Sequence, residues 1–177
     1  MIEIFTSRLI LCSFNSKDIT KQYLSWLNNR DLMQFSNQRF TNHTNMTALK
    51  YLKSFEDTAN LFIAIKEKNN NRMIGTMTAY ISKFHSTADL GILIGDKNFQ
   101  SSGYGQEAWK ALIDYLFYKK DIRKITAGCM ELNRSMLALM KKSGMKMEAA
   151  KKDQEKYKDN YVNLVFFCKF VDEHIKG

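Results

Sequence analysis

The spacing of apolar and polar positions changes along the chain, and each change predicts a different kind of secondary structure. Residues 4–14 form an apolar, β-rich run that predicts a first strand. Between residues 61 and 94, short apolar runs are separated by turn-forming residues such as Asn69–Arg72, which predicts an antiparallel meander. Strand-like and helix-like patterns then alternate to the end of the chain. The strands expected after the first are 61–66, 73–84, 88–94, 124–129, 145–150 and 161–170.

Helical spacing is clearest at 103–119, where four apolar residues share one face (Ala108, Leu112, Ile113 and Leu116). Ser16 and Asp18 are suited to cap a helix that contains Trp26. Further helices are expected at 31–36, from Asn45 onward, and at 134–142. The resulting element order predicts an α+β domain over residues 1–177, with about seven strands in one mostly antiparallel sheet and about four helices on its faces.

The formal net charge of +9 raises the question of an anionic partner. The lysines fall in small scattered groups, no arginine-rich arm is present, and aromatic residues do not alternate with basic ones. A nucleic-acid partner is therefore not expected. Charge alone leaves three readings open: a basic surface that is simply solvated, one that attracts a smaller polyanion such as coenzyme A, and a nucleic-acid-associated protein, which only the charge supports.

Cysteine usage and hydropathy bear on the compartment. Cys12, Cys129 and Cys168 are far apart and form no Cys-x-x-Cys pair, which argues against a disulfide framework or a zinc cluster. The first residues lack a basic segment followed by a long apolar stretch, and no run approaches the roughly 20 apolar residues of a membrane helix. We therefore expect a cytoplasmic protein with no bound metal and no membrane partner.

The segment between the 88–94 strand and the 103–119 helix carries the most specific chemistry. It contains Q-x-x-G-x-G from Gln100 to Gly105, at the point where a helix begins. Free N–H groups at a helix start attract anions, and glycines let the backbone approach a phosphate closely. The motif follows an antiparallel meander and is followed by Gln106-Glu107, so it fits neither the Rossmann nor the P-loop nucleotide signature. It is suited to a pyrophosphate.

Three motifs in order resemble the GNAT superfamily of N-acetyltransferases, over nearly the whole chain. The Q-x-x-G-x-G turn with Gly103–Ala108 is similar to the GYGxEA of the branch that includes ribosomal-protein N-terminal acetyltransferases. The run Thr6–Leu11 is similar to that branch's TxRLxLR opening. Asn133 followed by Lys142–Met145 resembles its N-x(8)-K-x-G-F ending. The resemblance implies the GNAT fold and transfer of an acetyl group from acetyl-CoA to an amine.

The resemblance also implies roles for individual residues. Backbone amides of the turn, together with Gln106, would hold the CoA pyrophosphate. The strand end would pair with the pantetheine arm, in a slot left where the fourth and fifth strands diverge, and Asn133 would contact the same arm. The implied cofactor residues are Ile92, Leu93, Ile94, Gln100, Ser101, Ser102, Gly103, Tyr104, Gly105, Gln106 and Asn133. Gly91 and Gly95 on either side of Ile92–Ile94 suit close approach by a ligand.

The departures from the family pattern bear on the chemistry. Many members carry a tyrosine seven residues after the asparagine, proposed to protonate the leaving thiolate, whereas this chain has Met140. Another donor or water would then protonate the sulfur. The same residue motivates the alternative of a GNAT-fold module that binds CoA with weak or no turnover.

An alkylammonium has a pKa of about 10, so a base must remove a proton before the nitrogen attacks the thioester. Asp89, on the strand before the turn, is the first candidate, with a solvent-facing carboxylate as the competing reading. His43 and His85 are weaker candidates because both are expected in loops or turns.

The amine acceptor is expected to bind the segment between the first two strands, where aromatic and hydrogen-bonding groups are mixed. The candidate residues are Trp26, Asn28, Asn29, Arg30, Gln34, Phe35, Arg39 and Phe40. A peptide N-terminus, a polyamine, another small-molecule amine and an amino sugar all stay open as acceptors. Because many relatives dimerise through their C-terminal strands, a homodimer is a further expectation.

Overall fold

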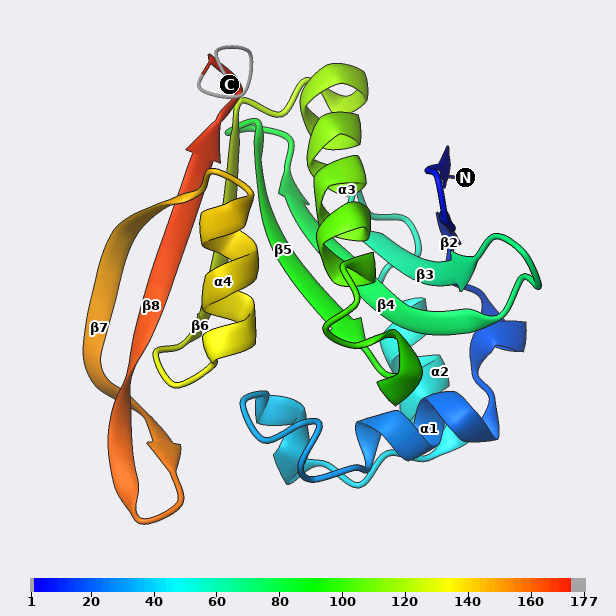
Figure 1. The fold of residues 1–177 in the computed structure, drawn as a ribbon, viewed down its shortest axis with the longest axis horizontal. Helices are drawn as coiled ribbons and strands as arrows, with labels where there is room; N and C mark the ends of the chain where they lie inside the picture. Colours follow the sequence, from blue (N-terminus) through cyan, green and yellow to red (C-terminus); the bar gives the residue numbers. More distant parts are fainter. Residues whose placement is uncertain (1, 173–177) are drawn as a thin grey trace.

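The computed structural model describes residues 2–172 and contains one sheet with strand order β1-β2-β3-β4-β5-β6-β8-β7 (Figure 1). All neighbouring strands are antiparallel except β5 and β6. The strands are β1 (Glu3–Phe5), β2 (Leu9–Ser13), β3 (Leu61–Glu67), β4 (Met73–Ser82), β5 (Thr87–Ile94), β6 (Lys124–Met130), β7 (Lys146–Tyr157) and β8 (Asn160–Phe170). The predicted α+β class with one mostly antiparallel sheet is confirmed.

The first predicted strand, 4–14, is wrong as a single element. It is a hairpin in which β1 pairs with β2, with Phe5 opposite Ile10. Thr6 closes the turn, because its N–H donates to the Leu9 carbonyl at 2.9 Å and its Oγ1 accepts from the Leu9 N–H at 2.9 Å. The apolar pattern continues through this turn without a glycine or proline, so the sequence shows no break, and the expected seven strands become eight.

Residues 2–172 contain four α-helices, in agreement with the predicted number of about four: α1 (Lys21–Leu27), α2 (Asn45–Lys53), α3 (Tyr104–Lys120) and α4 (Arg134–Lys142). The capping prediction for α1 is wrong, since Thr20 is its cap and Ser16–Asp18 form a separate 3₁₀ turn. The predicted helix at 31–36 is also wrong. Those residues form turns followed by a 3₁₀ turn at Asn37–Phe40, in keeping with the high cost of starting a short helix.

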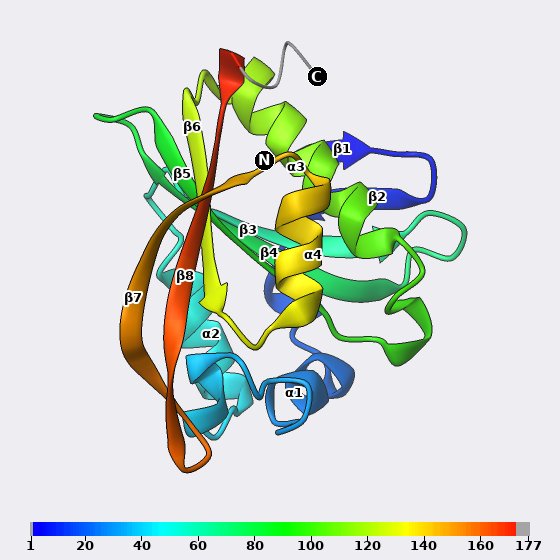
Figure 2. The ribbon, with the colours of Figure 1, turned by 60° about the vertical axis from the view of Figure 1, so that its left-hand side comes forward.

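The helices form two layers on opposite faces of the sheet (Figures 1 and 2). α3 and α4 pack on one face in a large core around Trp109 and Leu112. α1 and α2 pack on the other face in a smaller, aromatic-rich core around Trp26 and Phe62. Strand β5 serves both cores, because alternate side chains along it point to opposite faces. Leu90 therefore belongs to the first core and Leu93 to the second.

The C-terminal hairpin is longer than the sequence predicts. β7 runs to Tyr157, well past the predicted end at residue 150. Most of this strand is exposed at the sheet edge, so Lys151–Lys156 show no apolar alternation from which a strand could be predicted. The extension carries the tip of the β7–β8 hairpin to the segment between α1 and α2 (Figure 2).

Candidate active site

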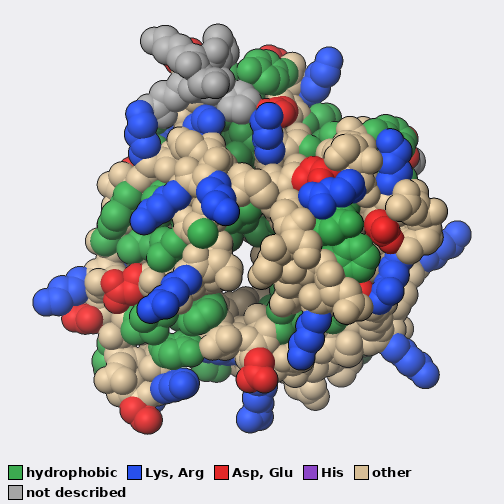
Figure 3. Space-filling view, viewed as in Figure 1, with side chains coloured by type: hydrophobic (Ala, Val, Ile, Leu, Met, Phe, Trp, Pro, Cys, Tyr) green, Lys and Arg blue, Asp and Glu red, His purple; other side chains and the backbone are tan. Residues whose placement is uncertain are grey.

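A slot opens between β5 and β6 near the middle of the sheet. The two strands pair in parallel only at Thr87–Asp89 and Lys124–Thr126. Beyond these residues β5 stays paired with β4 to Ile94, and β6 stays paired with β8 to Met130. The facing edges therefore diverge and leave backbone groups that belong to no ladder. Figure 3 shows an opening through the molecule in this region, and the expected divergence of the strands is confirmed.

The turn that leads into α3 lies at the open end of the slot. Ser101 and Gly103 adopt left-handed backbone conformations, with φ of +58° and +83°. Gly103 is the N-cap of α3, and no side chain caps that helix. The Gln100 side chain fastens the turn to β5, because its Nε2 donates to the Ile94 carbonyl at 2.8 Å. The first N–H groups of a 17-residue helix are thus left for an anion.

The two glycines of the turn are needed for different reasons. A side chain at Gly103 would be strained by its positive φ. A Cβ at Gly105 would lie 3.5 Å from Cγ1 of Ile94 and 4.0 Å from Cδ1 of Ile92, which is ordinary contact. Packing within the chain therefore does not require glycine at 105, whereas close approach of a ligand would.

Two motifs that are far apart in the sequence, Thr6–Leu11 and Gly103–Ala108, are in contact through the Glu107 side chain. Its Oε1 accepts from the hydroxyl of Thr6 at 2.6 Å, the hydroxyl of Ser7 at 2.9 Å and the N–H of Arg8 at 2.8 Å. Its Oε2 accepts from Nε of Arg8 at 2.6 Å. Partial burial acts to raise the pKa of Glu107, but these hydrogen bonds outweigh it and lower the pKa to about 2. The sequence motifs alone did not indicate this contact.

Arg8 extends the cluster to the Gln100–Gly105 turn. Its Nη1 donates to the Ser102 carbonyl at 3.2 Å, and its guanidinium lies 4.0 Å from the centre of the Tyr104 ring. Ser102 also donates from its hydroxyl to the Gln100 carbonyl at 3.1 Å. The turn is therefore held from β5 by Gln100 and from the β1–β2 hairpin by Arg8.

Asp89 lies at the closed end of the slot, as the last β5 residue that pairs with β6. Its Oδ2 accepts from the hydroxyl of Thr126 at 2.7 Å, and Tyr80 is its neighbour across the β4–β5 ladder. The side chain is exposed on the α1–α2 face, yet the surrounding strands partly desolvate it. This desolvation raises the pKa of the Asp89 carboxyl above its ordinary value, partly offset by the Thr126 hydrogen bond.

The two strand positions after Asp89 and Thr126 on the same face are both glycines. Gly91 follows Asp89 by two residues on β5, and Gly128 follows Thr126 by two residues on β6. No side chain from these positions lies between the Asp89 carboxylate and the slot. Side chains of neighbouring strands fill the space beside them instead: an added Cβ would lie 2.9 Å from Oγ1 of Thr78 at Gly91 and 3.0 Å from the Phe166 ring at Gly128.

The α4 residues singled out in the sequence have structural partners. Asn133 caps α4, because its Oδ1 accepts from the Met136 N–H at 3.1 Å. Gln106 links α3 to the end of α4 by donating from Nε2 to the hydroxyl of Ser143 at 2.8 Å. Met140 is fully buried in the core beneath the sheet and lacks a proton to donate.

The predicted acceptor residues lie together on the α1–α2 segment, and the side-chain amides of Asn28 and Gln34 are hydrogen-bonded within the chain. Trp26 is 6% exposed and packs against Gly95, where an added Cβ would lie 2.0 Å from its ring. The glycine at 95 therefore makes room for Trp26 rather than for a ligand. Asn28 joins the Leu24 and His43 backbones.

Gln34 and Phe35 join this segment to the C-terminal hairpin. The Tyr157 hydroxyl donates to Oε1 of Gln34 at 2.8 Å, and the rings of Phe35 and Tyr157 stack at 5.4 Å. The sequence predicts neither contact, because the partners are 123 residues apart in the case of Gln34.

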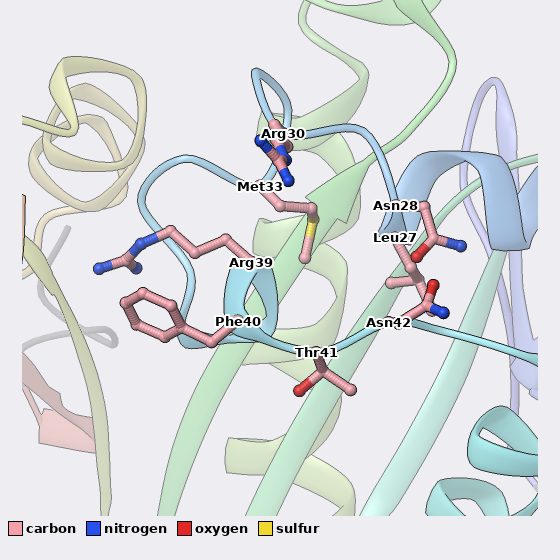
Figure 4. A pocket seen from close by; sticks show the side chains of 8 residues that line it. All are labelled: Leu27, Asn28, Arg30, Met33, Arg39, Phe40, Thr41 and Asn42. Carbon is pink, nitrogen blue, oxygen red and sulfur yellow. The ribbon is translucent and has the colours of Figure 1, made fainter. Parts of the chain in front are cut away.

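A cavity of about 360 Å³ lies on the same segment (Figure 4). Four of the eight predicted acceptor residues line it, namely Asn28, Arg30, Arg39 and Phe40. Its lining residues are Leu27, Asn28, Arg30, Met33, Arg39, Phe40, Thr41 and Asn42. A second hollow of about 330 Å³ on the other side of α1 is lined in part by Trp26, Gly95 and Lys97.

The fold and the divergent strands are those of an acetyltransferase domain, and sequence comparison agrees. The family model of the acetyltransferase (GNAT) domain matches residues 8–146, so the chain belongs to the GNAT family. Acetyl-CoA is the cosubstrate of this family, which confirms the predicted cofactor. No curated protein sequence matches the chain. Within residues 2–172, no helix has the length and apolar character needed to cross a membrane.

Solved structures similar to this one are also acetyltransferases. A GNAT-family acetyltransferase from Bacillus anthracis superposes with a TM-score of 0.82 at 18% identity, covering 97% of this chain and 100% of its own. The ribosomal α-N-protein acetyltransferase RimL in complex with coenzyme A superposes with a TM-score of 0.84 at 18% identity, covering 97% of this chain and 99% of its own. The spermidine N-acetyltransferase from Vibrio cholerae in complex with CoA and spermine superposes with a TM-score of 0.83 at 18% identity, covering 96% of this chain and 99% of its own. At these identities the similarity establishes the fold.

Proposed function

We propose that this chain transfers the acetyl group of acetyl-CoA directly to a primary amine, with both substrates bound at once. One arrangement carries the proposal: the slot has an uncapped helix N-terminus at its open end and a carboxylate at its closed end. An anion site and a base at the two ends of one slot suit a long cofactor with phosphates at one end and a reactive thioester at the other.

The cofactor would lie along β5. The amides of the Gln100–Gly105 turn, with Gln106 beside them, would hold the pyrophosphate, and the edge of Ile92–Ile94 would pair with the pantetheine amides. Asn133 would meet the same arm from the start of α4. From Ile94 back to Asp89 is five strand steps, or about 16 Å at roughly 3.3 Å per residue. The arm would thus bring the thioester toward Asp89.

Asp89 would act as the general base for the amine. It takes a proton from the ammonium, and the free nitrogen attacks the thioester carbonyl carbon. The nitrogen then loses a second proton to water, and the C–S bond breaks as the amide forms. A backbone N–H on the slot edge of β5 would stabilise the oxyanion. The raised pKa of Asp89 makes it a stronger base than an ordinary aspartate. Since a thiol has a pKa of about 8.5, the thiolate can leave and take its proton from water without a dedicated acid.

The test has two parts, donor binding and turnover. Acetyl-CoA and CoA, but not NAD, should raise the melting temperature. At a ligand concentration a hundredfold above Kd, the expected gain in the free energy of unfolding is about 2.7 kcal/mol. Thiol release from acetyl-CoA with a panel of amines then separates an enzyme from a module that binds CoA without turnover, the alternative that Met140 motivates. No shift with millimolar acetyl-CoA would refute the proposal.

Asp89→Asn tests the base. We expect kcat/KM to fall by at least about tenfold and its decline at acidic pH to disappear, because the group that must be deprotonated is gone. Asp159→Asn, which changes an exposed carboxylate in the β7–β8 turn, is the matched control and should leave the pH profile unchanged. Activity within about threefold of the unmodified protein at every pH would rule out Asp89 as the base.

A further inference from the structure

The cavity on the α1–α2 segment lies at the open end of the slot. Trp26 directly precedes Leu27, the first lining residue in the sequence, and packs on Gly95, which directly follows β5. Near the other end, Arg39 donates from Nη2 to the Lys156 carbonyl of the β7–β8 hairpin at 2.8 Å. The segment therefore bridges the two halves of the sheet that diverge around the slot (Figure 1).

The charge of this cavity is one-sided. Arg30 and Arg39 line it, and no aspartate or glutamate does. Within residues 2–172, Arg30 makes no hydrogen bond and no ion pair, and no carboxylate lies within 4 Å of either guanidinium. Two other arginines of the chain have such partners, since Arg8 pairs with Glu107 and Arg72 with Asp96.

The rest of the lining adds apolar surface and neutral polar groups. Met33 is buried, Leu27 is half-buried, and the Phe40 ring is 72% exposed beneath the Arg39 guanidinium, 4.2 Å from it. Thr41 and Asn42 are exposed at the same cavity. Figure 4 shows Arg30 and Arg39 on separate turns of the segment, with the Met33 side chain between Arg39 and Leu27.

We propose that this cavity binds an anionic group, a phosphate or a carboxylate, of the amine acceptor. The inference rests on the proposed function and narrows its substrate class to amines that also carry a negative charge. A guanidinium offers forked donors that match both kinds of oxyanion. Polyamines are poor acceptors on the same reasoning, because they bring further positive charge to a cavity with two arginines and no carboxylate.

Arg30 is the residue to change. Arg39 also holds the Ser36 and Lys156 carbonyls, so its loss would disturb the segment itself. Arg30 holds no other group within residues 2–172, so Arg30→Gln should leave the fold intact. Lys83→Gln removes the same charge from the β4–β5 turn, at the opposite end of the molecule from the cavity (Figure 1), and is the matched control.

The experiment measures binding and turnover with paired amines. Glucosamine 6-phosphate is compared with glucosamine for the phosphate, and glycylglycine with glycylglycinamide for the carboxylate, with spermidine as the polyamine. Calorimetry gives Kd with and without CoA, and thiol release gives kcat/KM. We expect one charged member to be favoured over its neutral partner by about tenfold or more, and Arg30→Gln but not Lys83→Gln to abolish that preference.

The pair that shows the preference identifies the anion as phosphate or carboxylate. Equal affinity for charged and neutral members, an unchanged preference in Arg30→Gln, better use of spermidine, or no binding of any charged amine at millimolar concentration would each overturn the proposal. Because Kd is measured without turnover, this result is independent of the proposed function. That function fails separately, if acetyl-CoA does not bind or no amine releases thiol.

Discussion

Replacing Glu107 by glutamine removes the negative charge that joins the β1–β2 hairpin to α3. Its carboxylate accepts four hydrogen bonds, from Thr6, Ser7 and Arg8, and is 16% exposed. Folding lowers its pKa from 4.5 to about 2. At about 1.36 kcal/mol per unit this corresponds to about 3.4 kcal/mol as an upper bound. Because Arg8 is 42% exposed, water screens its share, and we expect a loss of about 1.5–2.5 kcal/mol.

The pH dependence has a definite sign. A carboxyl with a lowered pKa in the folded state stabilises the fold fully above its unfolded pKa, and this stabilisation is lost as pH falls through the folded value. For Glu107 the window runs from about 4.5 down to about 2. At pH 3 the charge contribution should be roughly two-fifths of its value at pH 7. The difference between the unmodified protein and Glu107→Gln should shrink in the same proportion.

Urea denaturation at pH 7 and pH 3 measures this difference, and a melting curve should show a decrease of about 3–10 °C at pH 7. Glu56→Gln changes an exposed glutamate after α2 and should alter stability by less than about 0.5 kcal/mol. The reasoning is refuted if Glu107→Gln behaves like Glu56→Gln at pH 7, or if its deficit is as large at pH 3 as at pH 7.

Two glycine substitutions test the remaining geometry. Gly105→Ala should leave the melting temperature nearly unchanged, since the new methyl meets only ordinary contacts within the chain. It should weaken CoA binding by about tenfold or more, because the methyl would stand where the ligand approaches the backbone. A lower melting temperature with intact CoA affinity would contradict this. Gly95→Ala should destabilise the protein by about 1–3 kcal/mol or more in chemical denaturation, because its Cβ would overlap the Trp26 ring; unchanged stability would show that the ring can move aside.

The main elements follow from local pattern because both faces of the central strands are buried and the helices cover them with apolar stripes. The conformation of the Gln100–Gly105 turn was predictable for the same reason, since left-handed backbone and an uncapped helix start are local properties of Gly103 and its neighbours. Fold class, helix count and the divergence of β5 from β6 were all expected from the sequence and its family resemblance, and all are present.

The errors arise where distant residues decide local structure. The turn inside 4–14 is held by Glu107, about a hundred residues away, and nothing near Thr6 marks it. The turns at 31–36 are tied to Tyr157, and the outer half of β7 is polar on both faces. Arg30 and Arg39 were both among the residues expected to bind the acceptor, but the sequence could not show that they share one cavity whose lining holds no carboxylate.

The contact between the α1–α2 segment and the β7–β8 hairpin also sets the width of the slot. If β5 and β6 were joined only where they pair, at Thr87–Asp89 and Lys124–Thr126, the distance between their far ends could widen or narrow. The Tyr157–Gln34 hydrogen bond, the Phe35–Tyr157 stack and the Arg39–Lys156 bond tie that far end as well. Because the two strands are connected at both ends of the slot, the slot is rigid. Its dimensions are set before any ligand arrives, so less of the binding free energy is spent on ordering the protein.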